Sequence, residues 1–156
     1  MSKEDIEIVS IPVLKRSVYY SVLRNTIMIS YGELEQSTDL VLQATIYHEI
    51  KHRQLRVTPI MIWLSYITYS FLCLCLPFLL FFLIPFYLIL CFLLRLIEYE
   101  CDRYAYENTN MQYMLEFFND LKITQHDSKL KKFLYLFYWH PFTERRYDKI
   151  CQLSKY

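Results

Sequence analysis

Two histidines spaced four residues apart, with a glutamate between them, are the part of this chain best suited to chemistry. They lie in the segment His48-Glu49-Ile50-Lys51-His52. On a helix, His48 and His52 project from one face and can share a metal ion, while Glu49 flanks them and can reach water on that metal. This spacing is typical of zinc hydrolases, so it predicts a metallopeptidase with Glu49 as its general base.

A third metal ligand is expected, because catalytic zinc usually takes three protein ligands and keeps one position for water. The best candidate lies in Glu98-Tyr99-Glu100-Cys101-Asp102. Glu98 and Asp102 share a helical face, so one can bind the metal while the other accepts an N–H from a ligand histidine. Alternatively, the two carboxylates form a solvated acidic patch that pairs with Arg95 and Arg103.

Three ordered motifs make the chain resemble the HtpX and CAAX prenyl protease group of membrane gluzincins. Members combine HExxH with a downstream ExxxD and a late His-Pro segment followed by arginine. The matching residues, between roughly residues 25 and 150, are His48–His52, Glu98–Asp102 and His140-Pro141-Phe142-Thr143-Glu144-Arg145-Arg146.

The resemblance implies one zinc ion and a role for each matching side chain. By this resemblance, the zinc ligands are His48, His52 and Glu98, and the general base is Glu49. Asp102 would orient a ligand histidine. His140 and Arg146 would help to hold the substrate or the oxyanion.

The chain also departs from the family pattern. Lys51 stands where members usually have glycine, the chain is much shorter than the multi-span members, and Arg145 could take the place of Arg146. The spacing from Glu98 to Cys101 and Asp102 is also similar to that of membrane metallopeptidases that sense beta-lactams. We therefore expect a minimal form of the family, with the beta-lactam sensors as the other subfamily.

A long uncharged stretch separates the two halves of the expected metal site. No Asp, Glu, Lys, Arg or His occurs from Val57 to Leu94, a run far beyond the ~20 residues of one membrane crossing. It predicts a transmembrane helical hairpin over about residues 57–97. The other reading, a buried hairpin in a soluble protein, would require a short chain to enclose all of this apolar surface.

Two prolines decide the expected shape of this hairpin. With a turn at Pro77, the arms are Val57–Leu76 and Phe78–Leu96, each about 28 Å long by helical rise, and Pro85 kinks the second arm. This is the preferred geometry. If the turn instead occupies Pro77 to Pro85, the second arm is too short for a full crossing and the hairpin is partly re-entrant.

Basic residues flank the hairpin on both sides. Lys51, Arg53 and Arg56 precede it, and Arg95 and Arg103 follow it. By the positive-inside rule, this predicts an integral membrane protein whose termini and active site face the cytoplasm. The expected partners are the lipid bilayer and a membrane-associated peptide or protein substrate.

The elements around the motifs can be predicted from patterning. Ser37, Thr38 and Asp39 offer N-cap chemistry for the helix that carries the histidines. Short strands are expected at Val18–Leu23 and Thr26–Ser30, followed by a turn at Tyr31-Gly32. By resemblance, Thr26–Ser30 would be the edge strand that holds an extended substrate; otherwise the pair is an ordinary structural hairpin.

Amphipathic helices are expected over Met111–Leu121, Ser128–Tyr138 and Phe142–Leu153. Tyrosines and phenylalanines in these helices indicate core or membrane-interface packing: Tyr113, Phe117, Phe118, Phe133, Tyr135, Phe137 and Tyr138.

Composition narrows the function classes. The net charge is near +1, which gives no basic surplus for nucleic acid. Five cysteines without disulfide or metal-type spacing indicate reduced thiols, although Cys101 lies beside the expected site. Met1–Glu7 is charged and no apolar segment follows it, so no cleavable signal peptide is expected.

Together these features predict a mainly α protein with one domain over residues 1–156. It would be a compact gluzincin-like zinc-peptidase domain with a small N-terminal β-hairpin and an inserted transmembrane helical hairpin. Its expected activity is cleavage of membrane-proximal or hydrophobic peptides by Glu49-assisted attack of zinc-bound water. The alternatives are a regulatory or inactive zinc protein that acts through a partner, and a purely structural membrane protein.

Overall fold

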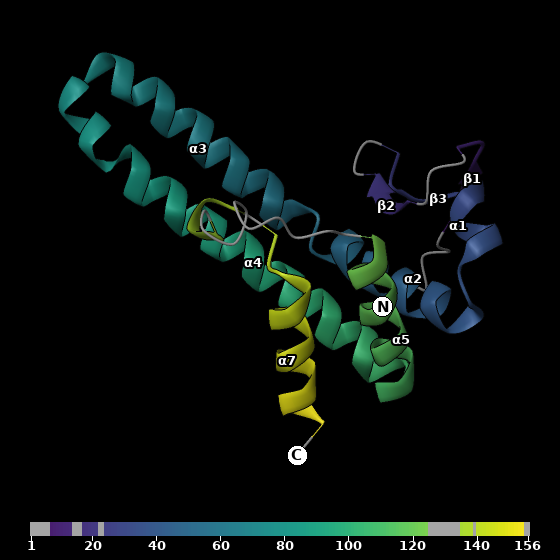
Figure 1. Ribbon diagram of the computed structural model, residues 1–156. Helices are drawn as coiled ribbons and strands as arrows, with labels where there is room; N and C mark the ends of the chain where they lie inside the picture. The colour runs from purple at the N-terminus through teal and green to yellow at the C-terminus, as the bar shows by residue number, and fades with distance from the viewer. Residues whose placement is uncertain (1–6, 14–16, 22–23, 125–134, 139, 155–156) are drawn as a thin grey trace.

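Helices make up most of the structure, a computed structural model that describes residues 7–13, 17–21, 24–124, 135–138 and 140–154. Two long apolar helices form a hairpin that projects away from the other elements, and a small sheet lies at the opposite end (Figure 1). The expectation of a mainly α chain with a small N-terminal β structure and an apolar hairpin is confirmed at this level.

The sheet has three strands rather than the two expected. Its order is β1-β3-β2, with β1 (Ile8–Ile11) parallel and β2 (Val18–Ser21) antiparallel to β3 (Thr26–Ser30). The predicted hairpin is therefore present as β2 and β3, while residues 22–23 of its first strand lie outside the described residues. The prediction that Thr26–Ser30 is the edge strand is wrong, because the unpredicted β1 covers its other side and buries all five of its residues. The strand nearest the helix that carries both histidines is β2.

The expected turn at Tyr31-Gly32 is also wrong, since helix α1 (Tyr31–Gln36) begins there. Its cap is Ser30, whose Oγ accepts a hydrogen bond from the Glu33 N–H at 3.2 Å. Such a bond satisfies one of the N–H groups that the first turn of a helix leaves without a partner. A serine at the end of a strand thus starts a helix at once.

The helix that carries both histidines is α2 (Asp39–Gln54). Its N-cap is Thr38, whose Oγ1 accepts a hydrogen bond from the Val41 N–H at 3.3 Å, so the predicted capping is confirmed. The helix therefore begins at Asp39, nine residues before His48, and it buries Val41, Ala44 and His48 on one face.

The hairpin consists of α3 (Val57–Cys75), the 3₁₀ helix η1 (Pro77–Phe82) and α4 (Leu83–Asn108). α3 ends at Cys75 and η1 begins at Pro77, so the turn at Pro77 in the preferred geometry is confirmed. Proline lacks an N–H, but the first turn of a helix has no intrahelical partner for that group, so Pro85 fits near the start of α4 without a kink. The second arm begins with the six residues of η1, which are 3₁₀ rather than α-helical.

Length and composition allow both arms to cross a membrane. The 19 residues of α3 span about 28 Å by helical rise, close to the ~30 Å hydrocarbon thickness. The apolar part of α4 before Arg95 is shorter, and η1 precedes it. At the tip, the Tyr69 hydroxyl donates a hydrogen bond to the Leu79 carbonyl at 3.0 Å, which satisfies one polar group of the irregular backbone there.

The remaining helices are α5 (Met111–Thr124) and α7 (Thr143–Leu153), with a short 3₁₀ helix, η2 (Tyr135–Phe137), between them. The predictions for Met111–Leu121 and Phe142–Leu153 are confirmed. Most of the helix expected over Ser128–Tyr138 lies outside the described residues, and its described end is η2, not an α-helix.

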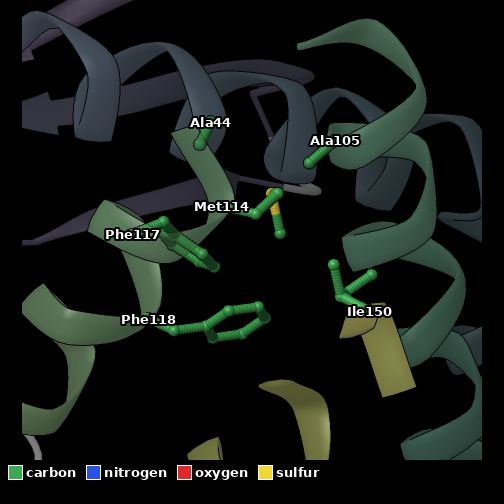
Figure 2. Close-up of a cluster of buried hydrophobic side chains, with 6 residues drawn as sticks. All are labelled: Ala44, Ala105, Met114, Phe117, Phe118 and Ile150. Carbon is green, nitrogen blue, oxygen red and sulfur yellow. The ribbon is translucent and has the colours of Figure 1, made fainter. Parts of the chain in front are cut away.

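Side chains from α2, α4, α5 and α7 form one buried core (Figure 2). The Phe117 ring of this core lies 6.0 Å from the His48 ring, between centroids. Phe117 and Phe118 are buried in it, so the prediction of core packing is confirmed for these two. A second cluster, Ile62, Leu90 and Leu94, joins α3 to α4. The first core fixes α4 against α2 and thereby positions the metal-site residues. It comprises Ala44, Ala105, Met114, Phe117, Phe118 and Ile150.

Candidate metal centre

The packing of α2 against α4 brings the two sequence motifs together. The two histidine side chains of α2 converge, with 3.1 Å between His48 Nε2 and His52 Nε2. The Glu98 carboxylate of α4 faces both, with Oε2 at 3.6 Å from His48 Nε2 and Oε1 at 3.4 Å from His52 Nε2. Glu98 thus lies next to both histidines, although it follows His52 by 46 residues in the sequence.

These separations fit a tetrahedral metal ion. Zinc binds nitrogen and carboxylate oxygen at about 2.0–2.2 Å, so two of its ligand atoms are about 3.3–3.5 Å apart in a tetrahedral site. The observed distances of 3.1, 3.4 and 3.6 Å lie around this value. His48 and Glu98 are buried, while the His52 side chain keeps 22% of its surface exposed. Donor atoms this close together could hold a metal ion, and the group is partly exposed at His52.

Asp102 orients one of the histidines. Its Oδ1 lies 2.9 Å from His48 Nδ1, on the side of the ring that faces away from His52. A carboxylate at this position favours a proton on Nδ1, so that the lone pair of Nε2 can point toward a metal. Asp102 thus lies next to the ligand-type histidine beside which the sequence predicted it.

Cys101, one turn after Glu98 on α4, is another possible metal ligand. Cys101 is fully buried, and its Sγ forms a group with a ring nitrogen of His48 and of His52 in which all three atoms lie within 4.8 Å of one another. The buried group of His48, His52 and Cys101 could hold a metal ion. Glu98 and Cys101 are three residues apart on a helix, which places both on the side that faces α2.

Glu49 lies beside the histidines with its carboxylate held by the sheet. Its Oε2 accepts a hydrogen bond from the Tyr20 backbone N–H of β2 at 2.7 Å. Burial raises the pKa of Glu49 to about 7, although the nearby His48 and the Tyr20 N–H both favour its charged form. A carboxylate with a pKa near neutrality is well matched to accept and return a proton.

The two histidines sit in different electrostatic surroundings. Burial by itself would lower the pKa of His48, but the carboxylates of Asp102 and Glu98 outweigh it and raise this pKa to about 9. For His52, burial and the neighbouring His48 lower the pKa to about 4. The field at His48 therefore favours a positive charge, which either a proton or a metal ion can supply.

Arg146 lies behind Asp102 rather than at the open side of the site. Its Nε donates to Asp102 Oδ2 at 2.7 Å and its Nη2 donates to Oδ1 at 2.6 Å. The guanidinium is buried and lies over the rings of Phe117 and Phe118, at 5.6 and 5.8 Å from their centroids. Arg146 thus supports the carboxylate that orients His48, and this position does not favour the predicted contact with substrate or oxyanion.

His140 reaches the site from the other end of the chain. Its Nδ1 lies 3.3 Å from Glu98 Oε1, and 52% of the side chain is exposed. It therefore lies at the partly exposed rim of the group. The structure brings all seven predicted residues into one region: His48, Glu49, His52, Glu98, Asp102, His140 and Arg146.

Tyr20 is the contributor that sequence reasoning missed. It takes part through a backbone N–H, which carries no signature in the side-chain pattern. The only available signal was the position of its strand just before the histidine helix. Cys101 was visible in the sequence, but its approach to both histidines depends on how α4 packs against α2.

Replacing Arg146 by alanine is expected to destabilise the fold by about 3–5 kcal/mol, because it leaves the buried Asp102 carboxylate without its partner. Thermal unfolding of the detergent-solubilised protein would measure this as a lower midpoint. Arg145→Ala is the matched control, since Arg145 is exposed one residue earlier on the same helix. Equal midpoints for the two variants would contradict a supporting role for Arg146.

No protein-family model, curated protein or solved structure matches this chain.

Proposed function

We propose that this chain is a membrane-embedded zinc metalloendopeptidase that cuts peptides at or near the bilayer surface. The observation that carries the proposal is the convergence of His48 Nε2, His52 Nε2 and the Glu98 carboxylate at 3.1–3.6 Å, with the Glu49 carboxylate alongside. The motif order shared with the HtpX and CAAX prenyl protease group adds support. His48, His52 and Glu98 would hold the zinc ion.

Each residue then has a chemical task. A zinc ion bound there would act as a Lewis acid and would lower the pKa of a coordinated water molecule. Glu49 accepts the proton of the attacking water and returns it to the leaving amine. Asp102 and Arg146 keep His48 in the orientation that binding requires. At the rim, His140 can donate an N–H to the oxygen that becomes negative as the peptide carbonyl is attacked.

Strand β2 is the best candidate to hold the substrate backbone. The Ser30 N–H donates to the Ser17 carbonyl at 3.0 Å, so Ser17 faces β3. Because strand residues alternate in direction, the N–H and C=O groups of Val18 and Tyr20 face away from β3. The Tyr20 N–H already meets Glu49 on that side. An extended peptide could pair with this outer edge and pass beside the general base.

The position of the hairpin limits the substrates. His52 lies five residues before α3 begins, and Glu98 lies three residues after Arg95, where the apolar part of α4 ends. If α3 and α4 cross the bilayer, the metal centre is at its surface. The basic residues on both sides favour a cytoplasmic position for that surface and for both termini, by the positive-inside rule. Substrates would be hydrophobic or membrane-associated peptides.

Cys101 favours one other function. With His48, His52 and Glu98 as ligands, the Cys101 thiolate would be a fourth, and closed four-coordinate zinc sites are structural rather than catalytic. In that case the chain would be a non-catalytic zinc protein that acts through a partner. Retention of zinc without peptide cleavage would indicate this function.

Metal removal tests the proposed activity directly. Protein purified in detergent should cleave an unfolded, hydrophobic peptide, lose that activity after treatment with a chelator, and regain it when about one zinc ion per chain is returned. The readout is peptide fragments resolved by mass spectrometry. Cleavage that persists in the metal-free protein, or a protein that never takes up zinc, would rule the proposal out.

A further inference from the structure

The short helix η2 lies against the apolar part of α4. The Phe137 carbonyl accepts a hydrogen bond from the Tyr87 hydroxyl at 3.1 Å, and the Cys91 thiol donates to the same oxygen at 3.7 Å. Figure 1 shows this yellow-green segment beside α4, on the hairpin side of α7. A piece of chain from beyond the helical core thus returns to the hairpin.

Helical geometry gives the depth of this contact. Cys91 lies four residues and Tyr87 eight residues before Arg95, the first charged residue after the apolar run. At 1.5 Å per residue these positions are about 6 and 12 Å inside the charged end of the arm. A leaflet of the hydrocarbon core is about 15 Å thick. The contact therefore falls within the acyl-chain region of one leaflet, if α4 crosses the bilayer.

The segment has the properties that such a depth requires. Non-helical backbone is tolerated among lipid chains only when its polar groups have partners in the protein, and the Phe137 carbonyl has two. Leu136 and Phe137 expose 59% and 45% of their surface. Over the same stretch, α4 exposes Ile89 and Phe92. Apolar side chains on both elements face outward together, and no charged residue lies within the described residues 135–138 of the segment.

We infer that η2 is a third membrane-inserted element, with Leu136 and Phe137 among the acyl chains of the cytoplasmic leaflet. The inference rests on the proposed membrane hairpin. It has a consequence for the site, because His140 follows η2 by three residues and contacts Glu98. The segment that leads to His140 would then lie in the lipid, next to the site. A peptide that meets His140 would therefore enter along the membrane surface.

Depth-dependent fluorescence quenching tests this placement. In a background with Trp63→Phe and Trp139→Phe, a single tryptophan is introduced by Leu136→Trp and the protein is reconstituted in phosphatidylcholine vesicles with brominated acyl chains. Phe71→Trp, on an exposed position of α3, reports the deep bilayer. Gln152→Trp, on an exposed position of α7, reports the aqueous side.

The inference predicts that Leu136→Trp is quenched most strongly when the bromines are near the headgroup end of the chains, and Phe71→Trp when they are deeper. If Leu136→Trp is as poorly quenched as Gln152→Trp while Phe71→Trp is quenched, η2 lies outside the lipid and the inference is wrong. If Phe71→Trp is not quenched either, the membrane hairpin itself fails. Zinc content and cleavage are measured separately, so the catalytic proposal is judged on its own data.

A pair of tyrosine variants tests the anchor. Tyr87→Phe removes the hydroxyl that holds the Phe137 carbonyl, and should move the quenching maximum of the tryptophan at position 136 toward shallower bromines. Tyr69→Phe is the matched control, since its hydroxyl bonds to the Leu79 carbonyl at the hairpin tip. Equal quenching profiles for the two variants would contradict the anchoring role of Tyr87.

Discussion

Replacing Glu49 by glutamine is expected to leave zinc in the protein and to lower peptide cleavage by about 10²- to 10⁴-fold, the usual contribution of a general base. The glutamine amide has nearly the same shape as the carboxylate, but it cannot accept the proton of the attacking water. The histidines and Glu98 are unchanged, so the metal should stay. Cleavage rates of a hydrophobic peptide and zinc content would be measured on the same preparations.

Glu100→Gln is the matched control for this experiment. Glu100 is on α4 and its side chain is 56% exposed, with Arg103 as a distant ion-pair partner at 4.0 Å. The same chemical change there should leave both cleavage and zinc content at the wild-type level. An equal rate for Glu49→Gln and Glu100→Gln would show that Glu49 is not the base.

Replacing Glu98 by alanine should have the second large effect, a loss of zinc affinity of more than about 100-fold. Changes to residues that only support a ligand already cost about 10- to 100-fold, and here a ligand itself is removed. Equilibrium dialysis against a zinc-buffered solution would measure the affinity. Glu100→Ala should bind zinc as the wild type does. Unchanged affinity in Glu98→Ala would mean that another residue is the third ligand.

Cobalt substitution identifies that residue in the same set of proteins. A cobalt ion bound to a thiolate has a near-ultraviolet charge-transfer band, whereas nitrogen and oxygen ligands alone give none. With Glu98 as the third ligand, wild type and Cys101→Ser should have the same cobalt spectrum, without this band. A band in the wild type that disappears in Cys101→Ser would instead assign Cys101 to the metal and favour the non-catalytic function.

Local patterns were enough to predict most of the helices. The cap at Thr38, the uncharged run from Val57 and the amphipathic stretch from Met111 each act over a few residues, and the structure contains α2, α3 and α5 there. Strand order could not be predicted in this way. β1 pairs with β3, although β2 lies between them in the sequence. Only this non-local pairing places Thr26–Ser30 in the centre of the sheet.

The site shows the same division. Helical spacing alone predicted that His48 and His52 face one metal, because both residues lie on a single helix. The relation between Glu98, Cys101 and the two histidines depends instead on how α4 rotates against α2, which Ala44 and Ala105 of the shared core allow at close range. The sequence offered no signal that Arg146 would lie behind Asp102, since a buried ion pair depends on the packing of a third helix, α7.

Helix α4 runs without interruption for 26 residues, about 39 Å, from the hairpin tip to beyond Asp102. Its first part lies in the proposed bilayer, and its second part carries Glu98 and Asp102. Hydrophobic helices tilt to match the thickness of the membrane around them, and because the buried core fixes α4 against α2, a tilt of α4 would turn α2 and its histidines with it. Bilayer thickness would then set the angle at which the two histidines and Glu98 face the membrane surface, while their spacing stays the same.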